Sequence, residues 1–156
     1  MSAALFFTLL FVVLFFMYTR FRDQKAGMLN AERGNQFLTE NAKRKNITTT
    51  DSGLQYEVLM KGEGGEKPQA DDVVRVQYHG RLINGEVFDS SVERGETVVF
   101  PLNRVIAGWT EGLQLMHIGD KLRFYIPAAL GYGYRSIGKI PAGSVLIFDV
   151  ELLAIE

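Results

Sequence analysis

The 156-residue sequence contains no cysteine. This absence excludes disulfide bonds, thiol catalysis, thiolate metal sites and a lipid-modified cysteine anchor. Histidine is scarce as well, since only His79 and His117 are present and neither has a second donor at metal-ligand spacing. A lone histidine on the polar face of a strand is more often a surface residue than a general base. We therefore expect neither a metal nor a cofactor.

Two common enzyme motifs are also missing. Ser90 and Ser91 lack the context of a nucleophile elbow. Gly131, Tyr132 and Gly133 are not followed by the third glycine and the helix that a dinucleotide-binding fingerprint requires. Neither covalent hydrolysis nor hydride transfer is indicated.

Positive charge is in short supply over the larger part of the chain. Residues 51–156 carry ten Lys and Arg against fifteen Asp and Glu, whereas residues 1–50 carry seven against three. An acidic surface repels phosphate, so we expect no nucleic-acid partner. A hydrophobic content of 47% with 16 glycines is typical of a packed, turn-rich domain.

Charge is absent from the first nineteen residues, and Ala3–Tyr18 contains only one polar residue, Thr8. As a helix this run would be about 28 Å long, close to the thickness of a hydrocarbon core. We expect residues 1–19 to be a transmembrane anchor. A cleaved signal peptide is the alternative, but no basic residue precedes the run and Met17–Arg20 is a poor cleavage site. A buried globular helix is a weaker alternative because the run is apolar on every side.

Arg20, Arg22 and Lys25 follow the apolar run. The positive-inside rule predicts that this flank is cytoplasmic, and contact with lipid phosphates is an equal alternative. Residues 20–52 are expected to form a helical spacer, in which Glu40 and Arg44 have the spacing of a helical ion pair. The polar and glycine-containing stretch over residues 48–53 marks a domain boundary.

From residue 53 onward the hydrophobic period changes to two, which predicts strands. Asn84-Gly85 predicts a tight hairpin turn. We expect strands over residues 54–58, 74–79, 86–88, 97–100, 122–126 and 146–150.

One short helix interrupts the strands. Val105, Trp109 and Leu113 recur at i, i+4 and i+8, so they form one apolar stripe of a helix within residues 105–116. Gly108 and Gly112 lie inside this helix and each costs it ~1 kcal/mol relative to alanine. Such a helix needs packing around it to be stable. The sequence thus predicts an α+β fold, with an antiparallel sheet wrapped around one short helix.

The aromatic residues are the remaining chemical feature. They lie in five segments that the sheet would bring together, and periodicity alone favours an ordinary core over a binding pocket. The set consists of Tyr78, Phe88, Phe100, Trp109, Tyr132 and Phe148.

The order and spacing of several motifs resemble the FKBP-type peptidyl-prolyl cis-trans isomerases over residues 53–156. The motifs are Val74-x-Val76-x-Tyr78-x-Gly80, Gly85-x-x-Phe88-Asp89-Ser90-Ser91, Val105-Ile106-x-Gly108-Trp109-x-Glu111-Gly112, Pro141 and Leu146-x-Phe148-Asp149-Val150-Glu151-Leu152. The segment from Gly34 to Tyr56 is similar to the bacterial branch that includes macrophage infectivity potentiator proteins. Together, the apolar run, the polar segment after it and the resemblance divide the chain into three parts: an anchor (1–19), a spacer (20–52) and an isomerase domain (53–156).

The resemblance also implies the site. Its catalytic residues would be Tyr78, Phe88, Asp89, Trp109, Tyr132 and Phe148. Its substrate-binding residues would be Phe100, Val105, Ile106, Ile140, Arg94 and Val98. In this arrangement Trp109 is the floor of an apolar pocket and Arg94 is the partner of Asp89.

The implied activity is rotation of X-Pro peptide bonds in client polypeptides, with macrocyclic FKBP inhibitors as further ligands. The alternative is a non-catalytic chaperone or binding module of the same fold. The implied location is the bacterial inner membrane, with a single-pass anchor. The likeness to the potentiator branch favours the periplasmic side, whereas the flanking charges favour the cytoplasmic side.

Overall fold

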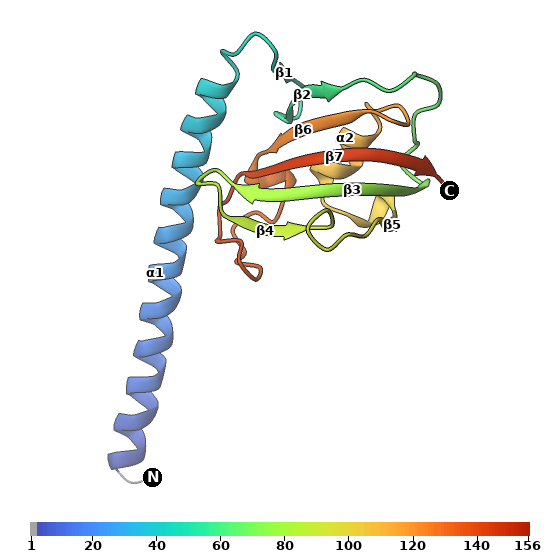
Figure 1. Ribbon diagram of the computed structural model, residues 1–156. Coiled ribbons are helices and arrows are strands. Elements are labelled where there is room, and N and C mark those ends of the chain that lie inside the picture. Colours follow the sequence, from blue (N-terminus) through green and yellow to red (C-terminus); the bar gives the residue numbers. More distant parts are fainter. Residues whose placement is uncertain (1–2) are drawn as a thin grey trace.

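The computed structural model describes residues 3–156, with the side chains of residue 8 and residues 10–156. A long helix stands beside a domain built from one antiparallel sheet and one short helix (Figure 1). The helices are α1 (Ala3–Asn41) and α2 (Ala107–Leu113), with 3₁₀ turns η1 (Leu102–Arg104) and η2 (Ala128–Leu130). The strands are β1 (Thr48–Thr49), β2 (Gln55–Met60), β3 (Val73–Leu82), β4 (Val87–Ser90), β5 (Val98–Pro101), β6 (Lys121–Ile126) and β7 (Leu146–Ile155).

Helix α1 runs without a break from the apolar N-terminal stretch through most of the predicted spacer. Within residues 3–156 no helix has a stretch that is long and apolar enough to span a membrane. The transmembrane anchor predicted over residues 1–19 is therefore not supported. Residues 1–2 of that prediction, and the side chains of residues 3–7 and 9, lie outside the described part of the chain.

The sheet has the strand order β1-β2-β6-β7-β3-β4 among the described residues, and β5 pairs with β3. The long central pair is β3 with β7, from Val74 opposite Ile155 to Leu82 opposite Leu146, with one register shift between Arg75 and Val76. The predicted hairpin at Asn84-Gly85 joins β3 to β4, with the amide of Gly85 bonded to the carbonyl of Leu82 at 3.0 Å. The predicted antiparallel α+β fold is confirmed.

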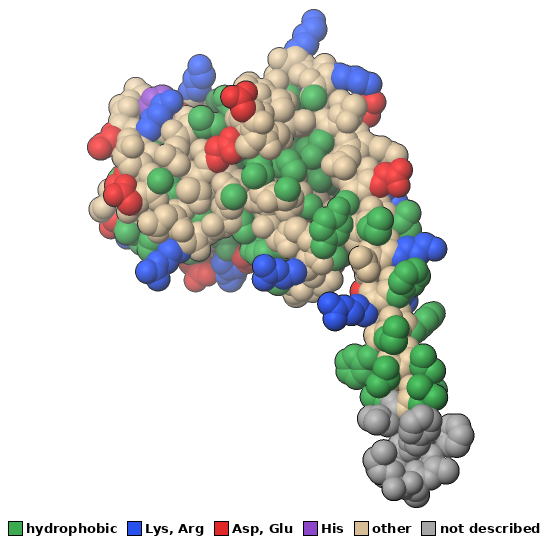
Figure 2. Space-filling model, turned by 180° about the vertical axis from the view of Figure 1, so that it is seen from behind, with side chains coloured by type: hydrophobic (Ala, Val, Ile, Leu, Met, Phe, Trp, Pro, Cys, Tyr) green, Lys and Arg blue, Asp and Glu red, His purple; other side chains and the backbone are tan. Residues whose placement is uncertain are grey.

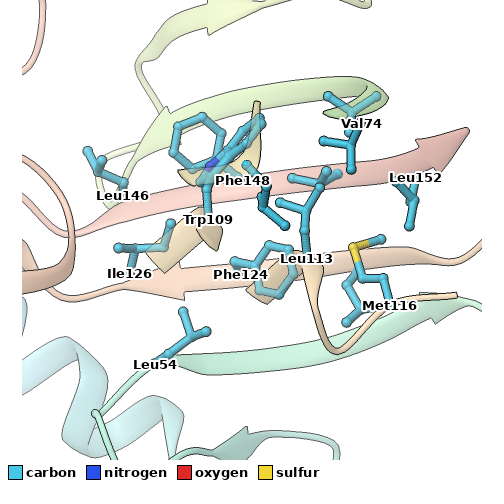
Figure 3. Packing of buried hydrophobic residues seen from close by; sticks show 14 of the residues in the cluster. Leu54, Val74, Trp109, Leu113, Met116, Phe124, Ile126, Leu146, Phe148 and Leu152 are labelled. Atoms are coloured by element: carbon cyan, nitrogen blue, oxygen red, sulfur yellow. The ribbon is translucent and has the colours of Figure 1, made fainter. Parts of the chain in front are cut away.

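Helix α2 packs its backbone directly on β6. A methyl group added at Gly108 would lie 2.6 Å from Ile126 Cγ2, and one at Gly112 would lie 2.7 Å from Phe124 Cε1. The two glycines that weaken this helix locally are thus required by its packing, which supplies the stabilisation (Figure 3). The helix is shorter than predicted, because residues 105–106 precede it in extended conformation.

A second apolar cluster lies on the other side of the sheet. Leu38, at the end of α1, packs there with Tyr125, Val145 and Ile147, and Phe37 adds to the cluster. Alternation along β6 and β7 turns these side chains away from α2. The end of α1 is therefore part of the packed structure.

A polar network joins the end of α1 to this face. Arg44 bonds both the Glu57 carboxylate, at 3.1 Å, and the hydroxyl of Tyr125, at 2.9 Å. The Tyr125 hydroxyl donates to Glu57, whose side chain is 6% exposed. The predicted ion pair of Glu40 with Arg44 does not form; because α1 ends at Asn41, Glu40 pairs instead with Lys43 at 2.6 Å. Burial and the bond to Glu57 raise the pKa of Tyr125.

Replacing Tyr125 by phenylalanine removes two hydrogen bonds to charged groups. We expect the free energy of unfolding to fall by about 1.5–3 kcal/mol in urea denaturation at pH 7. The exposed Tyr134→Phe variant is the control and should change it by less than about 0.5 kcal/mol.

The raised pKa of Tyr125 gives this prediction a pH signature. The stabilisation that the Tyr125 hydroxyl provides is complete below the pKa of an unfolded tyrosine, near 10. It is lost as the pH rises through the pKa of Tyr125 in the folded protein. The wild-type protein should therefore lose more stability above pH 10 than Tyr125→Phe does. Equal alkaline losses in the two proteins would contradict the assignment.

Candidate functional site

An open cavity of about 690 Å³ lies where α2, β3, β4, β5, β7 and the loop over residues 131–145 meet. The short hairpins and the single helix bring these segments together, although they are far apart in the sequence. The cavity is lined by Tyr78, Phe88, Asp89, Val98, Phe100, Arg104, Val105, Ile106, Trp109, Tyr132, Ile137, Gly138, Lys139, Ile140 and Phe148.

The floor of the cavity is the indole of Trp109, which is 5% exposed. Its ring centroid lies 5.1 Å from that of Phe148 and 5.2 Å from that of Tyr78, both nearly perpendicular to it. Phe100 packs against it at 5.3 Å. The edge-to-face contacts of Trp109 with Phe148 and Tyr78 add to the energy of burial and fix the rings. Figure 3 shows Trp109 beside Phe148. The indole Nε1 is buried without a hydrogen-bond partner among the described residues.

One polar group faces the cavity from β4. The Asp89 carboxylate accepts hydrogen bonds from Tyr78 and Arg94, and Arg94 also donates to the Tyr78 hydroxyl at 3.3 Å. Burial alone would raise the pKa of Asp89, but the bonds from Tyr78 and Arg94 outweigh it and lower the pKa. The carboxylate is therefore ionised, and it is not available as a general acid at neutral pH.

All predicted site residues except Arg94 line this cavity. Arg94 lies behind it, as the partner of Asp89 and with its guanidinium carbon 6.0 Å from the centre of the Tyr78 ring. The structure does not test the catalytic and substrate-binding roles of these residues, which stay predictions.

Sequence reasoning did not identify four lining residues, namely Arg104, Ile137, Gly138 and Lys139. Arg104 and Lys139 each adjoin a predicted site residue, which is the only local signal for them. Ile137 and Ile140 bond each other's backbone at 2.9 and 2.8 Å, closing a tight turn over residues 137–140. That pairing depends on three-dimensional structure and has no periodic sequence pattern.

The two histidines lie elsewhere. His79 contacts the Ser90 hydroxyl at 3.0 Å and His117 lies 3.4 Å from Asp120, and neither lines the cavity. In residues 3–156 no group of three His, Asp or Glu side chains is arranged to hold a metal ion. The lining of the cavity, which is mostly aromatic and aliphatic, is suited to an apolar group.

Comparison with models of protein families shows to which family the chain belongs. A family model described as FKBP-type peptidyl-prolyl cis-trans isomerase matches residues 64–153. The chain belongs to this family. A second model, for the domain amino-terminal to FKBP-type isomerases, matches residues 14–58 and therefore includes most of α1.

Relatives of this FKBP-family chain occur in several bacteria. It is 51% identical over 138 residues, 88% of its length, to the FKBP-type isomerase FkpA of Aeromonas hydrophila, and covers 51% of that protein. It is 52% identical over 135 residues to the FKBP-type 22 kDa isomerase of Escherichia coli, covering 86% of this chain and 65% of that protein. The isomerase Mip of Coxiella burnetii is 44% identical over 128 residues, covering 81% of this chain and 55% of that protein. The chain thus spans between half and two thirds of these relatives.

The solved structures agree. The crystal structure of FkpA from Escherichia coli superimposes with a TM-score of 0.89 at 37% identity, covering all of this chain and 74% of the other. A peptidyl-prolyl isomerase from Pseudomonas syringae gives a TM-score of 0.76 at 32% identity, covering 83% of this chain and 95% of the other. The similarity to the first of these structures covers the whole chain and therefore includes the long helix.

The mouth of the cavity carries a net positive charge. Arg104 and Lys139 are exposed and line it, and neither forms an ion pair within residues 3–156. The carboxylate of Asp89 pairs with Arg94, which also pairs with Glu96. The rest of the domain is acidic, so the mouth is a local basic site that favours anionic ligands.

We expect a peptide that carries a glutamate to bind in this cavity more tightly than the same peptide with a lysine in its place. Each exposed charge contributes about 0.2–1 kcal/mol, so the double variant Arg104→Gln, Lys139→Gln should reduce the preference about twofold to thirtyfold in a binding titration. The preference should also weaken with salt. The charge-matched double variant Lys45→Gln, Lys61→Gln is the control, and a preference that both double variants retain would argue against the basic mouth.

Proposed function

We propose that this protein is a peptidyl-prolyl cis-trans isomerase that accelerates rotation about X-Pro bonds in polypeptide clients. The single observation that carries the proposal is the open cavity floored by Trp109 and walled by aromatic side chains. Its volume and apolar lining suit a proline ring, and membership of the isomerase family supports the same activity.

The mechanism follows from the physics of the amide. Rotation of the prolyl bond breaks its resonance against a barrier of ~18–20 kcal/mol. The twisted amide has less charge separation than the planar one, so an apolar, water-poor cavity disfavours the planar ground state more than the twisted state. Lowering the barrier by ~4 kcal/mol corresponds to about a thousandfold acceleration.

The side chains have separate tasks in this mechanism. Trp109 and Phe148 hold the proline ring, and the Tyr78–Asp89–Arg94 network keeps the wall on that side fixed. Tyr132 lines the cavity and is 37% exposed, and we assign its hydroxyl the task of bonding a substrate carbonyl. No proton transfer and no covalent intermediate are required.

Replacing Trp109 by leucine should leave the protein folded and reduce turnover of a prolyl peptide at least tenfold, because the floor of the cavity is lost. The measurement is a protease-coupled assay of the cis-to-trans phase, with circular dichroism as the folding control. A macrocyclic FKBP inhibitor should suppress the wild-type phase. Unchanged turnover in folded Trp109→Leu would contradict the assignment of this cavity as the proline pocket. If the wild-type protein shows no accelerated phase, the alternative function, a non-catalytic binding module, is favoured instead.

We further propose that the N-terminal end of α1 attaches the protein to the bacterial inner membrane. The side chains over Leu10–Tyr18 are all exposed and almost all apolar, and Arg20 and Arg22 follow them (Figure 2). Contiguous exposed apolar surface of this kind marks a site of contact with a membrane or another protein.

Removing residues 1–19 should shift the protein from the membrane to the soluble fraction of cells. Reporter domains fused after Glu156, one active only outside and one only inside, would identify the side of the membrane. Full-length protein in the soluble fraction would contradict this location without affecting the proposed activity.

A further inference from the structure

We propose that α1 is a positioning element of the proline pocket: it holds the base of the loop over residues 131–145, and Asn30 is the residue through which it acts. The inference rests on the proposed function and extends it to the helix outside the cavity. Asn30 does not touch the cavity itself.

The backbone of α1 lies against the backbone of this loop. Gly143 has a φ of 73°, and a methyl group there would lie 2.2 Å from the carbonyl oxygen of Gly27 and 3.1 Å from the amide nitrogen of Ala31. One turn after Ala31, a methyl group on Gly34 would lie 2.7 Å from Val145 Cγ2. Contact this close leaves the base of the loop no room to move toward the helix.

Asn30 adds hydrogen bonds between these two glycine contacts. Its side-chain amide donates to the carbonyl oxygen of Ala142 at 2.9 Å and to the hydroxyl of Ser144 at 3.1 Å. The Ser144 hydroxyl in turn donates to the carbonyl oxygen of Pro141 at 2.6 Å. Residues 141, 142 and 144 are thereby tied to a helix more than a hundred residues earlier in the sequence.

The tied segment adjoins the cavity wall. Ile140 lines the cavity, and only Pro141 separates it from Ala142. Because proline fixes its own φ, a displacement of Ala142 is transmitted to Ile140 rather than absorbed between them. The tight turn of Ile137 with Ile140 then carries the displacement to the remaining wall residues of the loop.

The segment after α1 also reaches the floor of the cavity. The hydroxyls of Thr50 and Ser52 each donate to the carboxylate of Glu111 at 2.6 Å. Glu111 lies two residues after Trp109 in α2. The N-terminal segment therefore contacts both the helix that supplies the floor and the loop that supplies one wall.

The test compares Asn30→Ala with Asn35→Ala, whose exposed side chain lies on the same helix away from the loop. The affinity of a proline peptide is measured by the fluorescence of Trp109, the sole tryptophan of the sequence. Hydrogen exchange of residues 131–145 reports the order of the loop. Turnover is measured separately in the same proteins.

We expect Asn30→Ala to raise the dissociation constant and KM about threefold to tenfold, with kcat within a factor of two, and to speed exchange in residues 131–145. Asn30→Asp keeps the shape of the side chain but removes the donor and places a charge beside oxygen acceptors, so it should weaken binding at least as much. Asn35→Ala should match the wild type in all measurements.

Two outcomes would overturn the inference. One is equal peptide affinity in folded Asn30→Ala and the wild type, and the other is unchanged exchange in residues 131–145. If Asn30→Ala is unstable, Gly34→Ala displaces Val145 in the neighbouring contact between α1 and the loop and must weaken binding for the inference to stand. A wild-type protein that binds the peptide without accelerating rotation would refute the proposed function alone, since the affinity comparison would still decide the role of α1.

Discussion

The direct contact between the backbone of α2 and the strand β6 is the constraint on which the rest of the structure depends. Gly108 and Gly112 allow the helix to approach the side chains of Ile126 and Phe124 without an intervening layer. That approach places Trp109 at the bottom of an opening rather than in the middle of the core. The aromatic rings of β3 and β7 then surround an indole whose position is fixed by the helix.

The site is built from two parts that are fixed in different ways. Its floor and two walls come from α2 and the central strands, where ring contacts and the Asp89 network fix the side chains. Its remaining wall comes from the loop over residues 131–145, whose base is held by α1. The long helix is thus part of the structure that shapes the cavity, although it contributes no lining residue.

Sequence patterns with a short period predicted the sheet, the hairpin at Asn84-Gly85 and the central helix, because alternation and turn chemistry are local properties. The motifs shared with the FKBP family predicted which aromatic residues meet, a result that periodicity alone did not favour. The two-residue strand β1 was not predicted, since it is too short to alternate. The contacts of α1 were also missed, because Asn30 and Gly34 resemble ordinary residues of a polar helix until the distant loop is brought beside them.

Helix α1 is packed against the domain at one end and extends away from it at the other, so a movement of the far end is transmitted to the domain. Its 39 residues extend over about 58 Å at 1.5 Å per residue, and only the C-terminal part touches the domain. A tilt of α1 by a few degrees about its packed C-terminal part moves its N-terminal end by several ångströms. By the same geometry, a force applied at the N-terminal end acts on the packed part with a large mechanical advantage. Whatever binds the N-terminal end of α1 therefore sets the distance and the direction at which the mouth of the cavity lies from it.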